Sequence, residues 1–73
     1  SHIGAGVFID AFTVIESSAI EDHVQIRSHS VIEHSIIKNS AQIGPFAHIH
    51  KESIIGEQAA IGNFVEVSRS TIG

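Results

Sequence analysis

Isoleucine or valine returns at almost every sixth residue along the whole chain, separated mainly by polar or small residues. The recurring positions are Ile3, Ile9, Ile15, Ile20, Ile26, Ile32, Ile37, Ile43, Ile49, Ile55, Ile61, Val67 and Ile72. A small or β-branched residue usually stands four places after each of them, and glycine often follows directly. A short fixed period is typical of a repeat solenoid, and a six-residue period predicts a parallel β-helix.

Three hexads per turn predict a triangular prism, an all-β fold whose three faces are parallel sheets. The chain would form one β-helix segment of about four coils, at residues 3–19, 20–36, 37–54 and 55–71. Coils stacked about 4.8 Å apart would place Ile20, Ile37 and Ile55 in one inward file. An amphipathic helix would need apolar residues at i, i+3, i+4 and i+7, and this chain lacks that period.

The same stacking predicts an aromatic column at one corner of the prism. Phe12, His29, Phe46 and Phe64 are expected to lie above one another, with His29 between two phenylalanines. Pro45 and Asn63 occupy a neighbouring corner position, where a residue with a fixed φ or a tolerance for left-handed backbone suits a tight turn.

Composition narrows the functional classes. The 73 residues contain 4 Lys and Arg, 8 Asp and Glu, 6 His and no Cys. Disulfide and thiolate chemistry are excluded, and the acidic balance argues against nucleic acid as a partner. No apolar run approaches the roughly 20 residues of a membrane span, and no signal peptide is visible. We expect a cytoplasmic protein without a membrane partner. Both ends fall inside the repeat, so we expect the segment to be truncated from a longer protein.

Candidate chemistry gathers on the third predicted face. His48 and His50 flank the inward Ile49, so both point outward, roughly 7 Å apart along the strand. Stacking would place Glu66 beside His48, and Glu33 and Ser68 beside His50. The next column contains Ser17, His34, Lys51 and Arg69.

Three interpretations of this face stay open. In the first interpretation, the face is a solvated surface on which each His–Glu pair contributes about 0.2–1 kcal/mol to stability. Alternatively, Lys51, Arg69 and protonated histidines form an anion site for a phosphate. The third interpretation is a metal site built from His29 and His34, which stand five residues apart, although these two are expected on different faces.

Two stretches go beyond the hexad. Residues 43–50 (Ile-Gly-Pro-Phe-Ala-His-Ile-His) and 61–73 (beginning Ile-Gly-Asn-Phe-Val-Glu) resemble a bifunctional bacterial enzyme family. Its members combine N-acetylglucosamine-1-phosphate uridylyltransferase with glucosamine-1-phosphate N-acetyltransferase and make UDP-N-acetylglucosamine for the cell wall. Residues 12–18 and 31–35 are similar to the early coils of the acetyltransferase half, so the resemblance covers nearly the whole chain.

The resemblance implies a left-handed β-helix and a homotrimer whose acetyl-transfer sites form between chains. It also implies acetyl-CoA as co-substrate and Mg²⁺ for a nucleotidyltransferase domain outside this segment. The family's catalytic residues align beyond Gly73, so this segment alone is expected to be inactive and to contribute one wall of the sugar-phosphate site.

The resemblance also implies which residues bind the sugar phosphate, and it shows departures. The expected residues are His50, Ser68, Arg69, Glu66 and His48. His48 and His50 stand where the family has an arginine pair, and Ser68 stands where it has a lysine, so permanent positive charge is lost. No metal ligand belongs to this leading interpretation. The alternatives are a non-catalytic oligomerisation or spacer solenoid of a nucleotidyltransferase and, third, a metal-dependent protein similar to β-helical carbonic anhydrases.

Overall fold

A computed structural model describes residues 2–73, which form short strands joined by tight turns. These described residues include no helix that is long and apolar enough to cross a membrane. The strands are β1 (His2–Ile3), β2 (Phe8–Ile9), β3 (Val14–Glu16), β4 (Ala19–Ile20), β5 (Gln25–Ile26), β6 (Val31–Glu33), β7 (Ile36–Ile37), β8 (Gln42–Ile43), β9 (His48–His50), β10 (Ile54–Ile55), β11 (Ala60–Ile61), β12 (Glu66–Ser68) and β13 (Thr71–Ile72).

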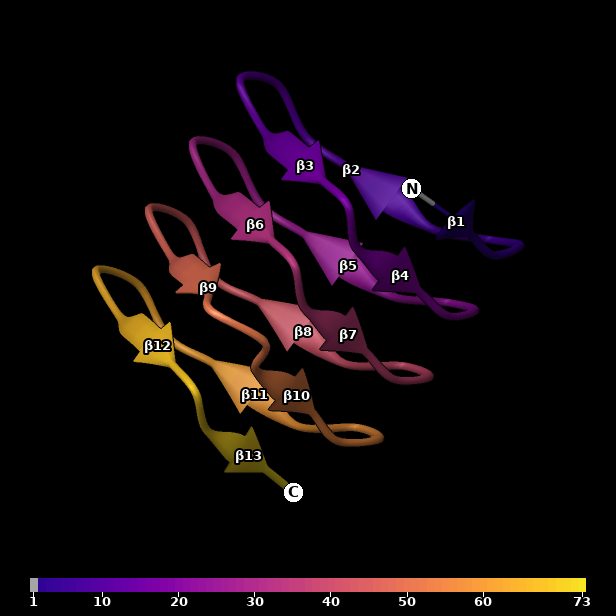
Figure 1. The fold of residues 1–73 in the computed structure, drawn as a ribbon. Helices are drawn as coiled ribbons and strands as arrows, with labels where there is room; N and C mark the ends of the chain where they lie inside the picture. The colour runs from indigo at the N-terminus through magenta and orange to yellow at the C-terminus, as the bar shows by residue number, and fades with distance from the viewer. Residues whose placement is uncertain (1) are drawn as a thin grey trace.

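Every third strand joins the same sheet, and all pairs are parallel. The sheets have the orders β1-β4-β7-β10-β13, β11-β8-β5-β2 and β12-β9-β6-β3. Figure 1 shows the resulting solenoid of about four turns, with successive coils descending in parallel from the N-terminus to the C-terminus. The predicted all-β fold is confirmed, and the arrangement agrees with a left-handed parallel β-helix.

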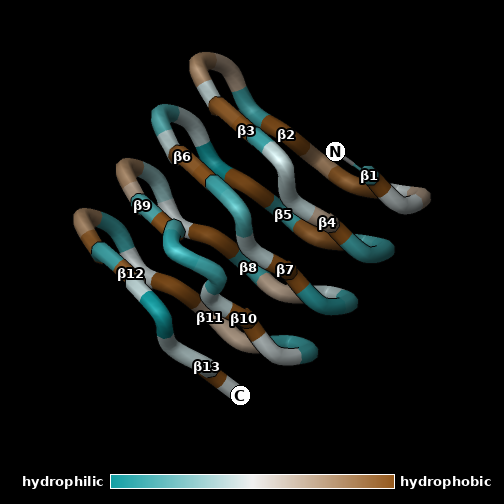
Figure 2. The backbone as a smooth tube through the Cα atoms, viewed as in Figure 1, coloured by the Kyte–Doolittle hydropathy of each residue, from teal (hydrophilic) through white to brown (hydrophobic). Residues whose placement is uncertain are grey.

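The predicted isoleucine files form the core. Ile37 pairs with Ile20 on one side and Ile55 on the other, and all three side chains are fully buried. Figure 2 shows the hydrophobic positions recurring in register from coil to coil. The recurring positions of the first coil are less buried. Ile3 and Ile9 remain 46% and 38% exposed, because that coil has a neighbouring coil on one side only.

Left-handed backbone makes the corners. The predicted column of Phe12, His29, Phe46 and Phe64 is confirmed, with ring centroids 4.9–5.1 Å apart and nearly parallel planes. All four residues have φ values of 57–61°. At these corners the left-handed backbone therefore falls on Phe46 and Phe64, and not on the residues before them, Pro45 and Asn63. Stacking of the rings offsets part of the cost of left-handed backbone in residues with a Cβ.

A ladder of serines closes the third corner, a feature that the period alone does not indicate. Its members are Ser18, Ser35, Ser53 and Ser70. Each hydroxyl donates to a backbone carbonyl two or three residues earlier, at 2.7–2.8 Å. The first three also accept a hydrogen bond from the backbone N–H of the next serine, at 3.1–3.3 Å. The ladder supplies acceptors for the backbone N–H groups of Ser35, Ser53 and Ser70 at this corner.

Candidate functional site

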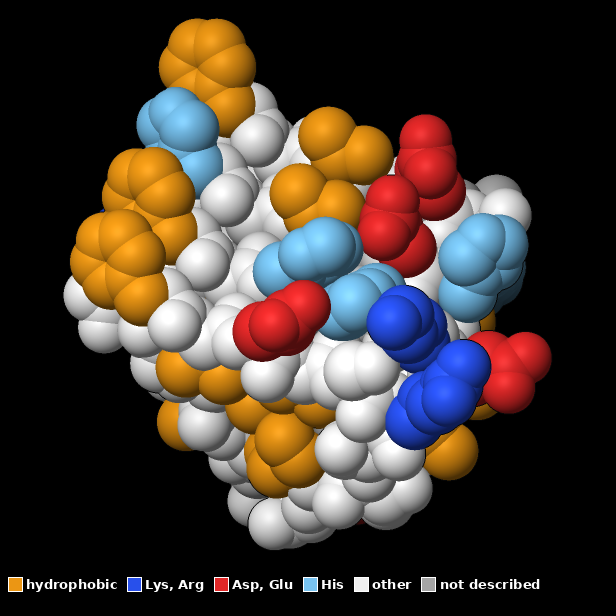
Figure 3. Space-filling view, turned by 60° about the vertical axis from the view of Figure 1, so that its left-hand side comes forward, with side chains coloured by type: hydrophobic (Ala, Val, Ile, Leu, Met, Phe, Trp, Pro, Cys, Tyr) orange, Lys and Arg blue, Asp and Glu red, His pale blue; other side chains and the backbone are white. Residues whose placement is uncertain are grey.

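The candidate site lies on the outward side of the sheet formed by β3, β6, β9 and β12. Side chains alternate across a strand, so the buried Ile49 turns both His48 and His50 outward. The register agrees with stacking, because His48 pairs with Glu66 and His50 pairs with Ser68. Figure 3 shows this face, with histidines, acidic and basic side chains gathered at its centre and the aromatic column along one edge.

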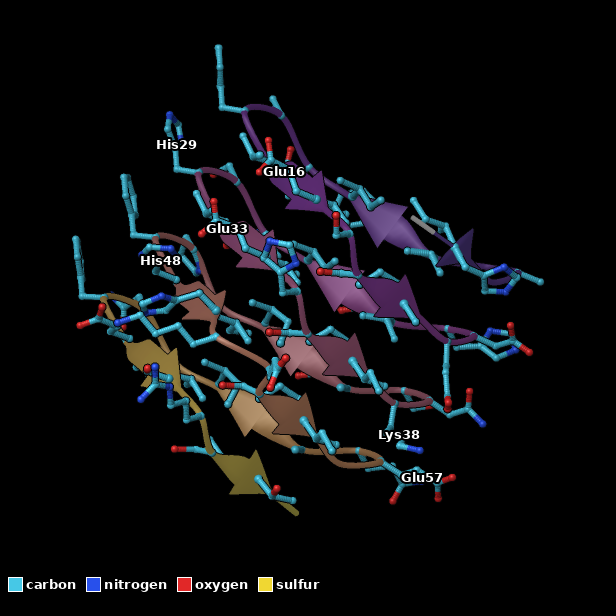
Figure 4. All side chains as sticks on the ribbon, viewed as in Figure 1. Glu16, His29, Glu33, Lys38, His48 and Glu57 are labelled. Atoms are coloured by element: carbon cyan, nitrogen blue, oxygen red, sulfur yellow. The ribbon has the colours of Figure 1, made fainter. Side chains whose placement is uncertain are left out.

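The side chains do not follow the vertical pairing of their backbones. His48 Nε2 lies 3.2 Å from Glu33 Oε1, and His50 Nε2 lies 2.9 Å from Glu66 Oε2. Both contacts are diagonal, so the side chains contact other neighbours than the ones that the stacking of the backbones places beside them. Glutamate is long enough to reach a diagonal neighbour on the next strand, which explains the difference. Figure 4 labels Glu33 and His48 on this face.

The two imidazoles lie much closer than their backbone spacing indicates. Their ring centroids are 4.1 Å apart with an interplanar angle of 16°. The expected 7 Å is the distance along the strand, and the rings lean together from it. The side chain of His50 is only 13% exposed, whereas that of His48 is 44% exposed. His50 is therefore held between its stacked neighbour and the carboxylate of Glu66.

An inserted residue shapes a hollow beside the histidines. The third coil is one residue longer at its third corner, where Lys51 and Glu52 have φ values of 59° and 63°. Among the described non-glycine residues with positive φ, these are the only two that are adjacent in sequence. The open hollow has a volume of about 480 Å³ and is lined by Glu33, His34, His50, Lys51, Glu52 and Arg69.

The basic residues of the chain fall into two groups. Arg27 lies 4.0 Å from Asp10, and Lys38 lies 3.8 Å from Glu21. Within residues 2–73, by contrast, neither Lys51 nor Arg69 has a carboxylate oxygen within 4.0 Å. The hollow therefore holds two cations that no acid of the described chain neutralises directly.

The structure brings together most of the residues predicted to bind a sugar phosphate. His50 and Arg69 line the hollow, and His48 and Glu66 join it through their contacts with His50. Ser68 does not line the hollow, although its backbone pairs with that of His50. The longer third coil was the sequence signal that could have identified the hollow.

The two proposed metal-binding histidines are not brought together. His29 lies between Phe12 and Phe46 in the aromatic column, whereas His34 lines the hollow. A different group, formed by Glu33, His48 and His50, places one possible ligand atom from each residue within 4.8 Å of the others.

Comparison with known proteins gives one family and a set of relatives. The family model described as the GMPPB C-terminal domain matches residues 1–73. Proteins named bifunctional protein GlmU are similar over the full chain, with 54% identity in Thermodesulfovibrio yellowstonii, 45% in Picosynechococcus sp. and 41% in Koribacter versatilis. In each case the match covers 100% of this chain and 16% of the relative. No solved structure matches significantly.

Proposed function

Because this chain belongs to the family of the GMPPB C-terminal domain and resembles bifunctional GlmU proteins throughout, we propose that it serves a sugar-phosphate acetyltransferase and uridylyltransferase. The chain spans about 16% of those relatives, so the reaction belongs to a longer protein. In this proposal the product is UDP-N-acetylglucosamine. The β-helix described here forms one wall of the sugar-phosphate site.

The observation that carries this proposal is the pair of cations at the hollow. Lys51 and Arg69 face a common space and have no carboxylate partner in the described chain. A guanidinium presents a planar fork of donors that matches phosphate oxygens, and an ammonium adds a compact charge. The phosphate of a sugar phosphate would satisfy both groups, with the sugar extending over the open side of the hollow.

The histidines have a different role from the arginines that the related family carries at their positions. The Nε2 atom of each imidazole already contacts a carboxylate, so neither ring offers that nitrogen to a phosphate in this arrangement. We therefore assign the direct phosphate contacts to Lys51 and Arg69. His50, His48, Glu66 and Ser68 remain proposed wall residues that contact the sugar or position the cations.

The proposed protein is a cytoplasmic homotrimer. The outward side of the five-stranded sheet presents Ala19, Ile36 and Ile54 in adjacent strands, and Ile36 is 38% exposed. An apolar strip of this kind favours packing between copies of the chain. Acetyl-CoA and Mg²⁺ would be used by parts of the protein outside this chain, so no step of their chemistry is assigned to these residues.

Replacing the cations in the full-length protein tests the proposal. For Lys51→Ala and Arg69→Ala we expect the KM for the sugar phosphate to rise about 10- to 100-fold, the loss of one charge-assisted hydrogen bond. The matched control is Arg27→Ala, because Arg27 is paired with Asp10 and both directly follow strands of another sheet, β5 and β2. An unchanged KM in both variants of the hollow would contradict the proposal.

A non-catalytic role is the second candidate, and one observation favours it. The carboxylates of Glu33 and Glu66 engage the histidines where the resembling family has an arginine pair. Under this alternative the β-helix is an oligomerisation or spacer solenoid of a nucleotidyltransferase. Purified full-length protein would then show uridylyl transfer that Arg69→Ala leaves unchanged, and it would show no acetyl transfer.

A further inference from the structure

The outward side of β9 carries two imidazoles, those of His48 and His50. His48 and His50 lie on the same face because they flank Ile49, and Glu33 reaches them from β6. One ligand atom from each of the three side chains lies within 4.8 Å of the other two. From this geometry we propose a binding site for a divalent transition-metal ion, formed by Glu33, His48 and His50.

The distances require only side-chain rotation to close the site. Bonds of about 2.0–2.2 Å from a tetrahedral metal to imidazole nitrogen and carboxylate oxygen place the ligand atoms roughly 3.4 Å apart. His48 Nε2 and Glu33 Oε1 already lie 3.2 Å apart. The terminal torsions of histidine and the three torsions of glutamate are soft, whereas the backbones are fixed by the buried isoleucine file.

Metal binding would change the arrangement of the rings. A metal bonds a ring nitrogen in the plane of that ring, and two parallel rings 4.1 Å apart do not share a plane. The imidazoles must therefore rotate out of their stack when the ion binds. The exposed His48 has room for this rotation, and the more buried His50 is the fixed member of the pair.

The donor set selects the kind of ion. Imidazole nitrogen suits Zn²⁺, Co²⁺, Ni²⁺ and Cu²⁺, whereas Mg²⁺ and Ca²⁺ prefer sites made of oxygen alone. The carboxylates of Glu33 and Glu66 supply negative charge beside the two imidazoles. Three protein ligands leave a coordination position open to water or a small ligand. The site differs from the interpretation based on His29 and His34, and it does not depend on the proposed sugar-phosphate function.

Metal titration of the chelator-stripped full-length protein tests the site. We compare wild type with the variant carrying both His48→Gln and His50→Gln, adding Zn²⁺ or Co²⁺ against a chromophoric competitor. The wild type should bind one more equivalent than the variant, and bound Co²⁺ should give a visible spectrum with nitrogen ligands. Glu33→Gln should weaken binding at least about 10-fold, the lower end of what loss of an outer partner costs. Mg²⁺ should not compete.

The matched control is His23→Gln, which removes an exposed histidine from another corner. This variant should bind Zn²⁺ as the wild type does. Equal stoichiometry and affinity in the wild type and the double variant would overturn the proposal, as would equal loss in His23→Gln. Circular dichroism of each variant checks the fold. If the double variant misfolds, the single Glu33→Gln variant decides, because unchanged Zn²⁺ affinity there would also overturn the site.

Discussion

The inward and outward sides of β9 depend on different kinds of information in the sequence. Ile49 is fully buried and lies in register with Ile32 and Val67, as the six-residue period predicts. On the outward side, His48 and His50 stack with each other and contact glutamates diagonally. An apolar residue at every sixth position determines which side chains are buried inside the prism. On the outward side, side-chain length and torsion determine which residues contact each other.

This difference has an energetic basis. An inward side chain exchanges water for a close-packed file, so its position is held by about 1.5–3 kcal/mol of burial. An outward pair gains only a few tenths to one kcal/mol, and water competes for each group. Substitutions on the two sides of a strand should therefore differ in their effect on stability by several-fold.

The largest expected effect comes from an inward isoleucine. Ile43 is fully buried on β8, and Ile43→Ala should lower the free energy of unfolding by about 2–5 kcal/mol, through lost burial and the cavity left behind. The adjacent Gln42 is exposed on the same strand, and Gln42→Ala should change stability by less than about 0.5 kcal/mol. Urea unfolding of the full-length protein, followed by circular dichroism, measures both. Similar losses for the two variants would contradict the comparison.

A smaller effect is expected at the serine ladder, which belongs to the buried side although its residues are polar. The Ser18 hydroxyl donates to the carbonyl of Glu16 and accepts from the N–H of Ser35. Ser18→Ala leaves the buried N–H of Ser35 without this acceptor, whereas the Glu16 carbonyl keeps the N–H of His34, and the change should cost about 1–3 kcal/mol. Ser17 is its exposed neighbour, so Ser17→Ala is the matched control in the same unfolding measurement. Unfolding midpoints that coincide for the two variants would show that the ladder does not stabilise the corner.

The fold could be predicted almost completely because burial repeats. Each coil places its isoleucines at the same three positions, so one error in the register would expose a whole file. The aromatic column of Phe12, His29, Phe46 and Phe64 was predictable for the same reason. The serine ladder was not, because serine is common in turns and its hydrogen bonds depend on corner geometry.

The site could be predicted only in its membership. Stacking placed His48, His50, Glu33 and Glu66 on one face, but the period carries no information about which glutamate reaches which histidine. The hollow depends on the extra residue in the third coil, where Lys51 and Glu52 both adopt left-handed backbone. A single insertion has no repeat to define it, so its shape came from the structure.

The smallest expected effect decides between diagonal and vertical pairing on the outward side. In a double-mutant cycle with a chelator present, His48→Ala and Glu33→Ala should show a coupling energy of about 0.2–1 kcal/mol, because their side chains are in contact. The control cycle joins His48→Ala with Glu66→Ala. These residues are paired through their backbones, but the Glu66 carboxylate is directed to His50, so coupling should be near zero. A stronger coupling of His48 with Glu66 than with Glu33 would restore the vertical arrangement. It would also remove Glu33 from the group of ligands that the metal site requires.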